Sequence, residues 1–434
     1  MIPEEWTERS IHEFATIKTG PFGTLLKASE YSVNDGVPLV SVGEIREGFL
    51  RITDTTPRVS EIVTRRLPQY VLNNGDIVFG RKGGVERSAL IRQHQDGWFL
   101  GSDGISIRPS NHCDAEYLAF QFQSLRVQRW LLQHSIGTTM PSLNQEILRR
   151  VLIPLPPTKP EQRAIAAALS DVDALIGSLD QLIAKKRDLK QGAMQELLTG
   201  KKRLPGFKGE WELKTLGNIG KFKNGLNKDS SAFGHGSPFV NLMDVFGVNA
   251  IRSTSHLGLV DSTKLDREVY DLRQGDVLFI RSSVKPSGVG LTAFVECDLT
   301  DTVYSGFLIR FRDEGALDSG FKKHCFYAES FRKKIIAASS VSANTNINQN
   351  ALGGLSLLLP PTKAEQSAIA AVLSDMDAEI AALAQRRDKT RDLKQGMMQE
   401  LLTGRTRLVG GRMGQREPMK GRGHATHETL GDNA

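Results

Sequence analysis

One segment of this 434-residue chain occurs twice, and this repetition constrains the fold more than any other feature. Leu155 to Leu204 aligns without a gap on Leu359 to Leu408, and 35 of the 50 positions are identical. A repeat of this kind marks a duplicated structural unit. Only two copies occur, and a different, longer stretch precedes each one. The chain is therefore a duplicated pair of domain and segment, and not a solenoid.

The repeated segment has the pattern of a long helix. Thr158 and Glu161 form the T-x-x-E pattern of a capping box, as do Thr362 and Glu365, and prolines precede both pairs. Gly200 lies where the first helix should end. An unbroken helix from residue 161 to 198 would be roughly 57 Å long at ~1.5 Å per residue.

Apolar residues recur along both copies at alternating spacings of four and three, which is typical of a coiled-coil seam. The predicted seam residues are Ile165, Leu169, Val172, Ile176 and Leu179 in the first copy and Ile369, Leu373, Met376, Ile380 and Leu383 in the second. A single stripe of this kind is also typical of an ordinary core helix. Two such stripes in one chain can bury each other, so an antiparallel coiled coil is expected.

The stretches before the two helices are related weakly to each other. The matching pieces are the openings 6–20 and 211–225, the GD(I/V)xFxR segments 72–81 and 272–281, and the short motifs 143–145 and 347–349. Runs of β-branched and aromatic residues between Gly, Asp and Asn predict strands, and one or two helices are expected at 115–133 and at 321–338.

The sequence thus predicts an α+β fold class: two similar mixed α/β domains, separated by two long helices that pair as an antiparallel coiled coil, in a pseudo-twofold internal repeat. The predicted boundaries are 1–154 and 204–358 for the mixed domains, 155–203 and 359–408 for the helical segments, and 409–434 for a disordered basic tail.

Composition indicates a cytoplasmic protein. No apolar run approaches the ~18 residues of a membrane span, and the first residues lack a signal-peptide pattern, so no membrane contact is expected. Cys113, Cys297 and Cys325 fit neither a zinc site nor a disulfide framework. The net charge of +7 is only weak support for nucleic-acid binding.

The duplicated PPTKxEQxAIAAxLSDxDA segment, the QELLTG helix end, the Trp-to-Gly openings and the GD(I/V)xFxR segments resemble the specificity (S) subunit of a type I restriction-modification enzyme. The resemblance covers about residues 5–408 and is most specific in the repeated helix. LLTG occurs once in each copy, so the spacer repeats of some family members are not present.

The resemblance implies that each mixed domain is a target recognition domain for one half of a bipartite double-stranded DNA sequence. The helices would act as a ruler between the two domains and dock two modification (M) subunits, which carry S-adenosylmethionine and methylate adenine. Restriction (R) subunits, with ATP and Mg²⁺, would complete the nuclease. Because the two domains differ, the DNA target should be asymmetric.

Catalysis by this chain itself is not expected, and we expect no catalytic, cofactor-binding or metal-binding residues. The sequence has neither the N/D-P-P-Y/F loop of adenine methyltransferases nor a GxxxxGK(S/T) phosphate loop. Asp76 with Arg81 and Lys82 could suggest a metal-dependent nuclease, but a turn into a strand explains Asp76 as well. Two alternatives stay open: a scaffold that does not recognise DNA, and an enzyme that acts on DNA.

Candidate DNA contacts are polar residues at equivalent places in the two domains, because Lys and Arg bind phosphates and Asn, Gln and Arg recognise base edges. In the first domain they are Lys18, Lys27, Arg81, Lys82, Arg87, Thr138 and Thr139. In the second they are Lys221, Lys223, Asn224, Asn227, Lys228, Arg281, Lys285, Asn344 and Asn346. A solvated surface charge or a loop-stabilising amide is the alternative for each of them.

Overall fold

The computed structural model describes residues 2–137, 140–341 and 343–408. The predicted contacts Thr138 and Thr139 and the predicted tail 409–434 lie outside the described residues. The chain divides into two compact units. Unit 1 comprises Met1–Gly177 and Asp388–Ala434, and unit 2 comprises Ser178–Arg387.

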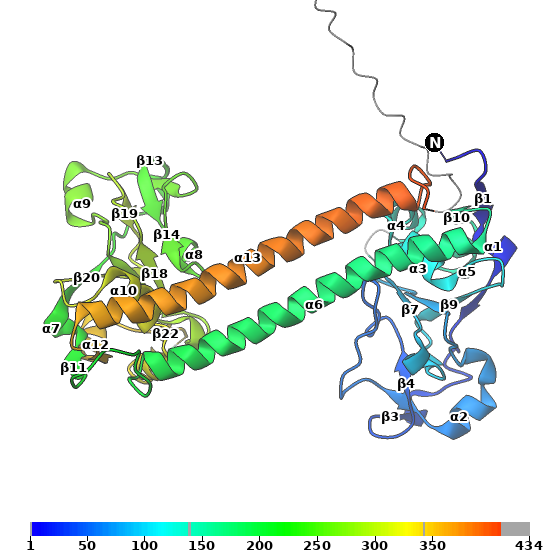
Figure 1. Cartoon of the computed structure of the whole chain (residues 1–434), viewed down its shortest axis with the longest axis horizontal. Coiled ribbons are helices and arrows are strands. Elements are labelled where there is room, and N and C mark those ends of the chain that lie inside the picture. Colours follow the sequence, from blue (N-terminus) through cyan, green and yellow to red (C-terminus); the bar gives the residue numbers. More distant parts are fainter. Residues whose placement is uncertain (1, 138–139, 342, 409–434) are drawn as a thin grey trace, which may run out of the picture. The chain divides into compact units, whose positions relative to one another are not determined.

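The repeated segments form the two long helices that the sequence predicts (Figure 1). Helix α6 spans Lys159–Leu197 and helix α13 spans Lys363–Leu401, with 39 residues each. Gly200 and Gly404 follow the helix ends with φ of +70° and +75°, the left-handed conformation in which a helix commonly terminates at glycine.

Only half of each predicted capping box forms. The backbone N–H of Glu161 donates to Thr158 Oγ1 at 3.4 Å, and that of Glu365 donates to Thr362 Oγ1 at 3.2 Å. The two glutamate carboxylates, however, bind arginines from the opposite end of the repeat. The T-x-x-E pattern therefore located the helix starts correctly but missed the ion pairs.

Unit 1 is built on a four-stranded antiparallel sheet of order β2-β9-β6-β7. Its strands are β2 Ala15–Thr19, β9 Gly104–Pro109, β6 Ile77–Gly80 and β7 Ser88–Leu90. A second sheet, β3-β5-β4-β8, contains Tyr31–Ser32, Arg58–Val59, Val37–Val40 and Phe99–Leu100. The helices and turns are α1 Ile11–Phe14, η1 Ala28–Glu30, α2 Glu61–Arg66, η2 Pro68–Tyr70, η3 Gln93–Gln95, α3 Ala115–Gln123, α4 Leu125–His134 and α5 Gln145–Arg149.

Unit 2 repeats this plan with five strands in the order β12-β20-β16-β18-β14. They are β12 Gly220–Asn224, β20 Leu308–Asp313, β16 Val277–Ile280, β18 Thr292–Val295 and β14 Ala250–Ile251. Smaller sheets are β15-β13-β19 (Gly258–Val260, Phe233–Val240, Val303–Tyr304) and β17-β22-β21 (Ser282–Ser283, Thr345–Asn346, Ser340–Val341). The helices and turns are α7 Leu216–Ile219, η4 Ser230–Ala232, α8 Leu242–Val245, α9 Lys264–Val269, η5 Pro286–Gly288, α10 Ser319–Cys325, α11 Glu329–Ala337 and α12 Gln349–Gly354.

An antiparallel strand pair closes each mixed domain where the chain enters and leaves it. Strand β1 (Thr7–Ser10) pairs with β10 (Leu152–Leu155), and β11 (Glu212–Thr215) pairs with β23 (Ser356–Leu359). The long helix follows at once in both cases. Each domain is thereby fixed at the start of its own helix.

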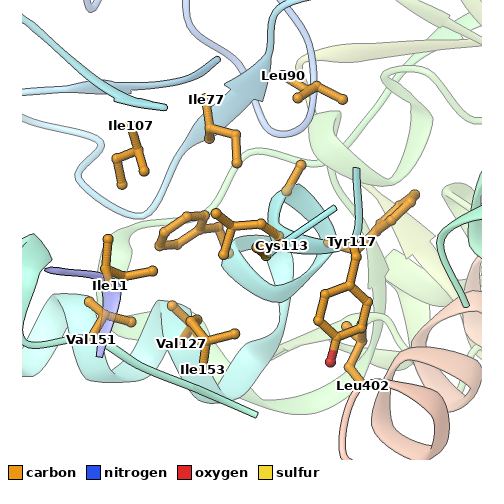
Figure 2. Close-up of a cluster of buried hydrophobic side chains, with 14 of the residues drawn as sticks. Ile11, Ile77, Leu90, Ile107, Cys113, Tyr117, Val127, Val151, Ile153 and Leu402 are labelled. Atoms are coloured by element: carbon orange, nitrogen blue, oxygen red, sulfur yellow. The ribbon is translucent and has the colours of Figure 1, made fainter. Parts of the chain in front are cut away.

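The main core of each unit lies between the sheet, the short helices and the ends of the two long helices. In unit 1 the core includes Ile77, Ile107 and Val127, and Figure 2 shows the phenol of Tyr117 directed toward Leu402. The Tyr117 hydroxyl donates to Pro154 O at 2.7 Å. This residue therefore fixes the strand that leads into α6.

Four predicted seam residues belong to these domain cores. Ile165 and Leu169 are in the core of unit 1 with residues from the end of α13, while Ile369 and Leu373 are in the core of unit 2 with the end of α6. All four are 1% exposed or less. Leu179 is also buried, and the half-buried seam residues are Val172, Ile176, Met376, Ile380 and Leu383. The first turns of each long helix thus pack in the core of a domain, and a heptad pattern alone does not reveal this.

Candidate nucleic-acid interface

The GD(I/V)xFxR segments form the central strands β6 and β16, and their aspartates are framework residues. Arg108 donates to both carboxylate oxygens of Asp76 at 2.7 Å, and the backbone N–H of Asn73 donates to Oδ2 at 2.8 Å. Asp76 is 2% exposed, and the pairing raises the pKa of Arg108. Protein donors therefore occupy this carboxylate, which supports the turn interpretation over a nuclease metal ligand.

The second domain repeats this arrangement. Arg312 donates to Asp276 Oδ1 at 2.7 Å and to Oδ2 at 2.6 Å, and the backbone N–H of Arg273 donates to Oδ2 at 2.9 Å. The pairing raises the pKa of Arg312. Among the described residues, no group of three or more His, Cys, Asp or Glu side chains is placed to hold a metal ion.

The arginine at the end of each motif lies beside the polar loop in which the sequence places further candidate contacts, residues 137–145 in the first domain and 339–350 in the second. The backbone N–H of Leu143 donates to Arg81 O, and that of Ile347 donates to Arg281 O, both at 2.9 Å. In the first domain, Gly83 N also donates to Pro141 O at 2.9 Å. Two groups of candidate contacts that are far apart in sequence are therefore adjacent in both domains.

Each loop folds back as a short ribbon on the segment after that arginine. In the first domain Ser142 bridges to both Lys82 and Ile136, and we call these three paired segments ribbon 1. In the second domain Asn346 on β22 pairs with Ser282 on β17 and with Ser340 on β21; this sheet is ribbon 2. The two loop segments correspond at the repeat offset of 204 residues.

The opening strands place two candidate lysines in matching environments. Lys18 Nζ lies 5.3 Å from the ring centroid of Tyr70, and Lys223 Nζ lies 5.4 Å from that of Tyr270. Each of the two predicted lysines therefore makes a cation–π contact with a tyrosine of its own domain. Sequence reasoning missed the tyrosines, although both precede the GD segment by a few residues.

Equivalent amides in the two loops brace the ends of these strands. Gln145 Nε2 donates to Thr19 Oγ1 at 3.0 Å. When the oxygen and nitrogen of the Gln349 side-chain amide are exchanged, its oxygen accepts from the backbone N–H of Asn224 at 2.8 Å. The candidate Asn224 is therefore engaged at its backbone by a framework residue. Asn144 and Asn348 cap helices α5 and α12, the shared framework role that the repeat suggests.

Several other candidates lie apart from the ribbons or are already paired. Lys221 pairs with Glu314 at 2.8 Å, at the opposite end of β12 from Asn224, and Lys228 pairs with Asp266 at 3.0 Å. The remaining candidates lie on exposed loops: Lys27, Arg87, Asn227 and Lys285. Only a subset of the predicted contacts is thus brought together with the ribbons.

Exposed apolar side chains next to the candidates were missed by sequence reasoning. Phe22 is 59% exposed, and the guanidinium carbon of Arg81 lies 5.8 Å from its ring centroid. Ile136 and Met140 in ribbon 1 are 57% and 60% exposed. A search restricted to polar residues could not have found them.

Two equivalent ion pairs connect the ends of the long helices within each unit. In unit 1 Arg407 binds Glu161, with Nη2 to Oε2 at 2.9 Å, and in unit 2 Arg203 binds Glu365, with Nε to Oε1 at 2.8 Å. Both glutamate side chains are nearly inaccessible. We call these pairs the helix-end clamps.

A glutamine beside each clamp fixes the first helix after the main sheet. Gln162 Oε1 accepts from the backbone N–H of Asp114, and Gln366 Oε1 accepts from that of Asp318, both at 2.7 Å. The aspartates in turn cap α3 and α10. The same residues therefore attach the domain to its helix in both units.

Within each unit, charged pairs also join α6 to α13. Asp173 pairs with Lys394 in unit 1 at 2.7 Å, and in unit 2 Lys190 pairs with Asp377 at 2.5 Å. Beside the second pair lies a cavity of 690 Å³ lined in part by His324. Burial lowers the pKa of His324 to about 4, and the positive charges of Lys190 and Lys323 act in the same direction. The negative charge of Asp377 acts in the opposite direction.

The comparisons with known proteins agree with this duplicated architecture. Residues 3–185 and 208–390 each match the family described as "Type I restriction modification DNA specificity domain". The putative type I restriction enzyme MjaX specificity subunit of Methanocaldococcus jannaschii is 26% identical over 433 residues, covering 94% of this chain and 95% of that protein. The EcoKI specificity subunit of Escherichia coli K12 is 22% identical, covering 85% and 81%.

Solved structures share the fold. The S subunit of the type I restriction-modification system from M. genitalium aligns with a TM-score of 0.53 at 15% identity, covering 92% of this chain and 96% of that one. A chain from a type I R-M system, studied for complex assembly and conformational transition, aligns with a TM-score of 0.60 at 19% identity, covering 94% and 100%. None of the described helices is both long and apolar enough to span a membrane.

Proposed function

The chain belongs to the type I restriction-modification DNA specificity family, and on that premise we propose that it gives such a complex its DNA target without catalysing a reaction itself. The domain at 1–154 recognises one half of a bipartite sequence, and the domain at 204–358 recognises the other. The target is asymmetric because the two recognition surfaces differ.

One observation carries this proposal: the two domains share their framework but differ in the ribbons. The Asp–Arg pair of the central strand, the bracing glutamine and the helix-end clamp occur in both units. In contrast, Lys82 and Ile136 in ribbon 1 correspond to Ser282 and Ser340 in ribbon 2. A repeated framework with different exposed residues is what two DNA-recognition modules of unlike specificity require.

The two long helices act as the spacer, paired as an antiparallel coiled coil with pseudo-twofold symmetry. This proposal is supported by the order of the ion pairs within each unit. In unit 2, Lys190 pairs with Asp377 and Lys186 pairs with Glu379. Residue numbers therefore decrease along α6 as they increase along α13, as in an antiparallel pair. A stiff spacer fixes the separation of the half-sites, just as the spacing of paired DNA-binding modules fixes their target.

Assembly supplies the chemistry that this chain lacks. Two M subunits dock on the equivalent helical surfaces and carry the S-adenosylmethionine for adenine methylation. R subunits bind through the complete assembly and use ATP and Mg²⁺. The complex works in the cytoplasm, where its DNA substrate is found.

Phosphate contacts come from the cations near the ribbons, with Lys18 and Lys223 as the equivalent pair. Their aromatic neighbours restrict both ammonium groups without neutralising them. Each lost phosphate contact should lower the slope of log affinity against log salt by about 1. Lys264 on α9, 86% exposed in its side chain, is a control because it is a surface lysine that belongs to neither a ribbon nor an opening strand.

The test is to produce the chain together with an M subunit encoded beside it and to map the methylated adenines in the host DNA. We expect one bipartite motif with two different half-sites, which disappears when this chain is omitted. Lys223→Ala should weaken DNA binding and reduce its salt dependence, and Lys264→Ala should not. Methylation with no dependence on this chain would refute the proposal, as would methyl transfer or cleavage by the isolated chain.

A further inference from the structure

The two ribbons share the pairing of one central residue with both neighbouring segments, but they expose different chemistry at matching positions. Ser142 lies between Lys82 and Ile136, as Asn346 lies between Ser282 and Ser340. The structure thus equates positions 136, 140 and 142 with positions 340, 344 and 346. This equivalence allows each exposed side chain to be compared directly with its counterpart.

Ribbon 1 presents apolar side chains to solvent. Ile136 and Met140 are more than half exposed, and Ser142, which pairs with Ile136, also pairs with the cationic Lys82. Removing both apolar side chains from water would be favourable, yet no described part of the domain covers them. A surface of this composition suits an apolar group that lies close to phosphates.

Ribbon 2 presents an amide at the position of Met140. Asn344 is exposed in this hairpin, and Val341, which pairs with Thr345, is 78% exposed. Asn346 supports this hairpin, because its Nδ2 donates to Asn344 O at 2.9 Å. Ser340 Oγ donates to Asn346 O at 3.4 Å and supports the same hairpin.

We infer that in each domain the ribbon is the element that recognises bases in the major groove. Ribbon 1 does so by apolar contact of Ile136 and Met140 with a thymine methyl group. Ribbon 2 does so at an A·T pair, where Asn344 binds the adenine edge and Val341 meets the thymine methyl. This inference rests on the proposed function, and it assigns base recognition to a few named side chains.

The physical basis is the shape and chemistry of B-DNA. Its major groove admits a two-stranded β-ribbon, Asn pairs with the N6 and N7 of adenine, and apolar side chains contact the thymine methyl. The cations that flank the ribbons, Arg81, Lys82 and Arg281, match the charge of the phosphates. This charge favours DNA over an apolar protein surface as the partner.

The decisive experiment transplants ribbon 2 chemistry onto ribbon 1. The triple variant Ile136→Ser, Met140→Asn and Ser142→Asn gives the first domain the residues of the second at these three positions. Gly137 is kept, because its φ is +97° and a Cβ there would lie 2.9 Å from Met140 O. Methylated motifs are mapped for the complexes of the wild-type chain and of the variant with the M subunit.

The expected result is a changed base preference in the first half-site, an unchanged second half-site and normal co-purification of the M subunit. An unchanged first half-site with full methylation overturns the inference. Loss of M co-purification by a folded variant also overturns it, because the ribbon would then be a protein contact. If the wild-type chain gives no bipartite motif, the proposed function itself fails.

A single substitution in ribbon 2 gives an independent answer even if the triple variant does not fold. Asn344→Ala changes an exposed side chain and should lower discrimination at one base pair of the second half-site by about 10-fold. Asn350→Ala, also exposed but on α12, is the matched control and should change nothing. Unaltered discrimination in Asn344→Ala overturns the assignment for ribbon 2.

Discussion

Removing the arginine of a helix-end clamp should destabilise the unit that contains it. In unit 1 the Glu161 side chain is 2% exposed and that of Arg407 is 27% exposed. Arg407→Ala leaves this carboxylate buried without its cation. Breaking a buried ion pair from one side costs ~3–5 kcal/mol, and the partial exposure of Arg407 favours the lower end, ~3 kcal/mol.

The second clamp provides an internal comparison. Glu365 accepts from Arg203 and also from Trp211 Nε1 at 3.3 Å, whereas Trp6 Nε1 in unit 1 has no acceptor among the described residues. Arg203→Ala therefore leaves its glutamate with one remaining donor. We expect Arg203→Ala to cost less free energy of unfolding than Arg407→Ala.

The assay is thermal unfolding of the full chain. In a domain of 150–250 residues 1 kcal/mol shifts Tm by ~2–4 °C, so Arg407→Ala should lower the transition of unit 1 by about 6–12 °C. Arg405→Ala is the matched control, because its pair with Glu400 is 3.4 Å long and exposed, and exposed pairs contribute ~1 kcal/mol or less. Replacing both Glu161 and Arg407 with Gln should recover most of the loss. Equal stability of Arg407→Ala and Arg405→Ala would refute the reasoning.

Three further predictions concern the helices and the buried histidine. Leu169→Ala and Leu373→Ala should each lower the free energy of unfolding by ~2–5 kcal/mol, because both side chains are fully buried in domain cores. Leu393, which is 58% exposed on α13, is the control, and Leu393→Ala should be nearly neutral in melting curves. A shifted DNA target in variants that stay folded would contradict a purely structural role for the two buried leucines. Because the pKa of His324 falls from 6.5 to about 4 on folding, the neutral ring contributes stability above pH 6.5 that is lost as pH falls to 4, ~3 kcal/mol in all. His324→Phe, the residue type at the equivalent place in unit 1, should flatten that dependence in unfolding measured from pH 7 to 4, and an unchanged slope would disprove it. Four residues inserted after Thr199 should change the spacer of the mapped DNA motif and neither half-site; an unchanged spacer would argue against the ruler.

The duplicated segment made the long helices predictable, because its caps, its terminal glycine and its apolar spacing all lie within one continuous stretch. The helix-end clamp was not predictable, since it joins Glu161 to Arg407 across 246 positions. Periodicity also could not separate a helix–helix seam from a domain core. Ile165 and Leu169 satisfy both patterns, and only the packing of the sheet decides between them.

The candidate interface was predicted in part for a similar reason. The arginine after the GD(I/V)xFxR strand and the polar loop were both identified from sequence, and backbone hydrogen bonds bring them together in each domain. Lys221 was also chosen for its charge, but strand register places it at the far end of β12. Met140 was passed over as an apolar residue, because exposure cannot be inferred from residue type alone.

The central claim is that each domain recognises its own half-site, and one engineered chain tests it directly. Residues 6–150 are replaced with a second copy of residues 211–354, so that the same domain precedes both helices. The methylated motif of this chain with its M subunit is then mapped. The account predicts a symmetric target made of two inverted copies of the wild-type second half-site. A motif that keeps the original first half-site, in a chain that no longer contains the first domain, would contradict it.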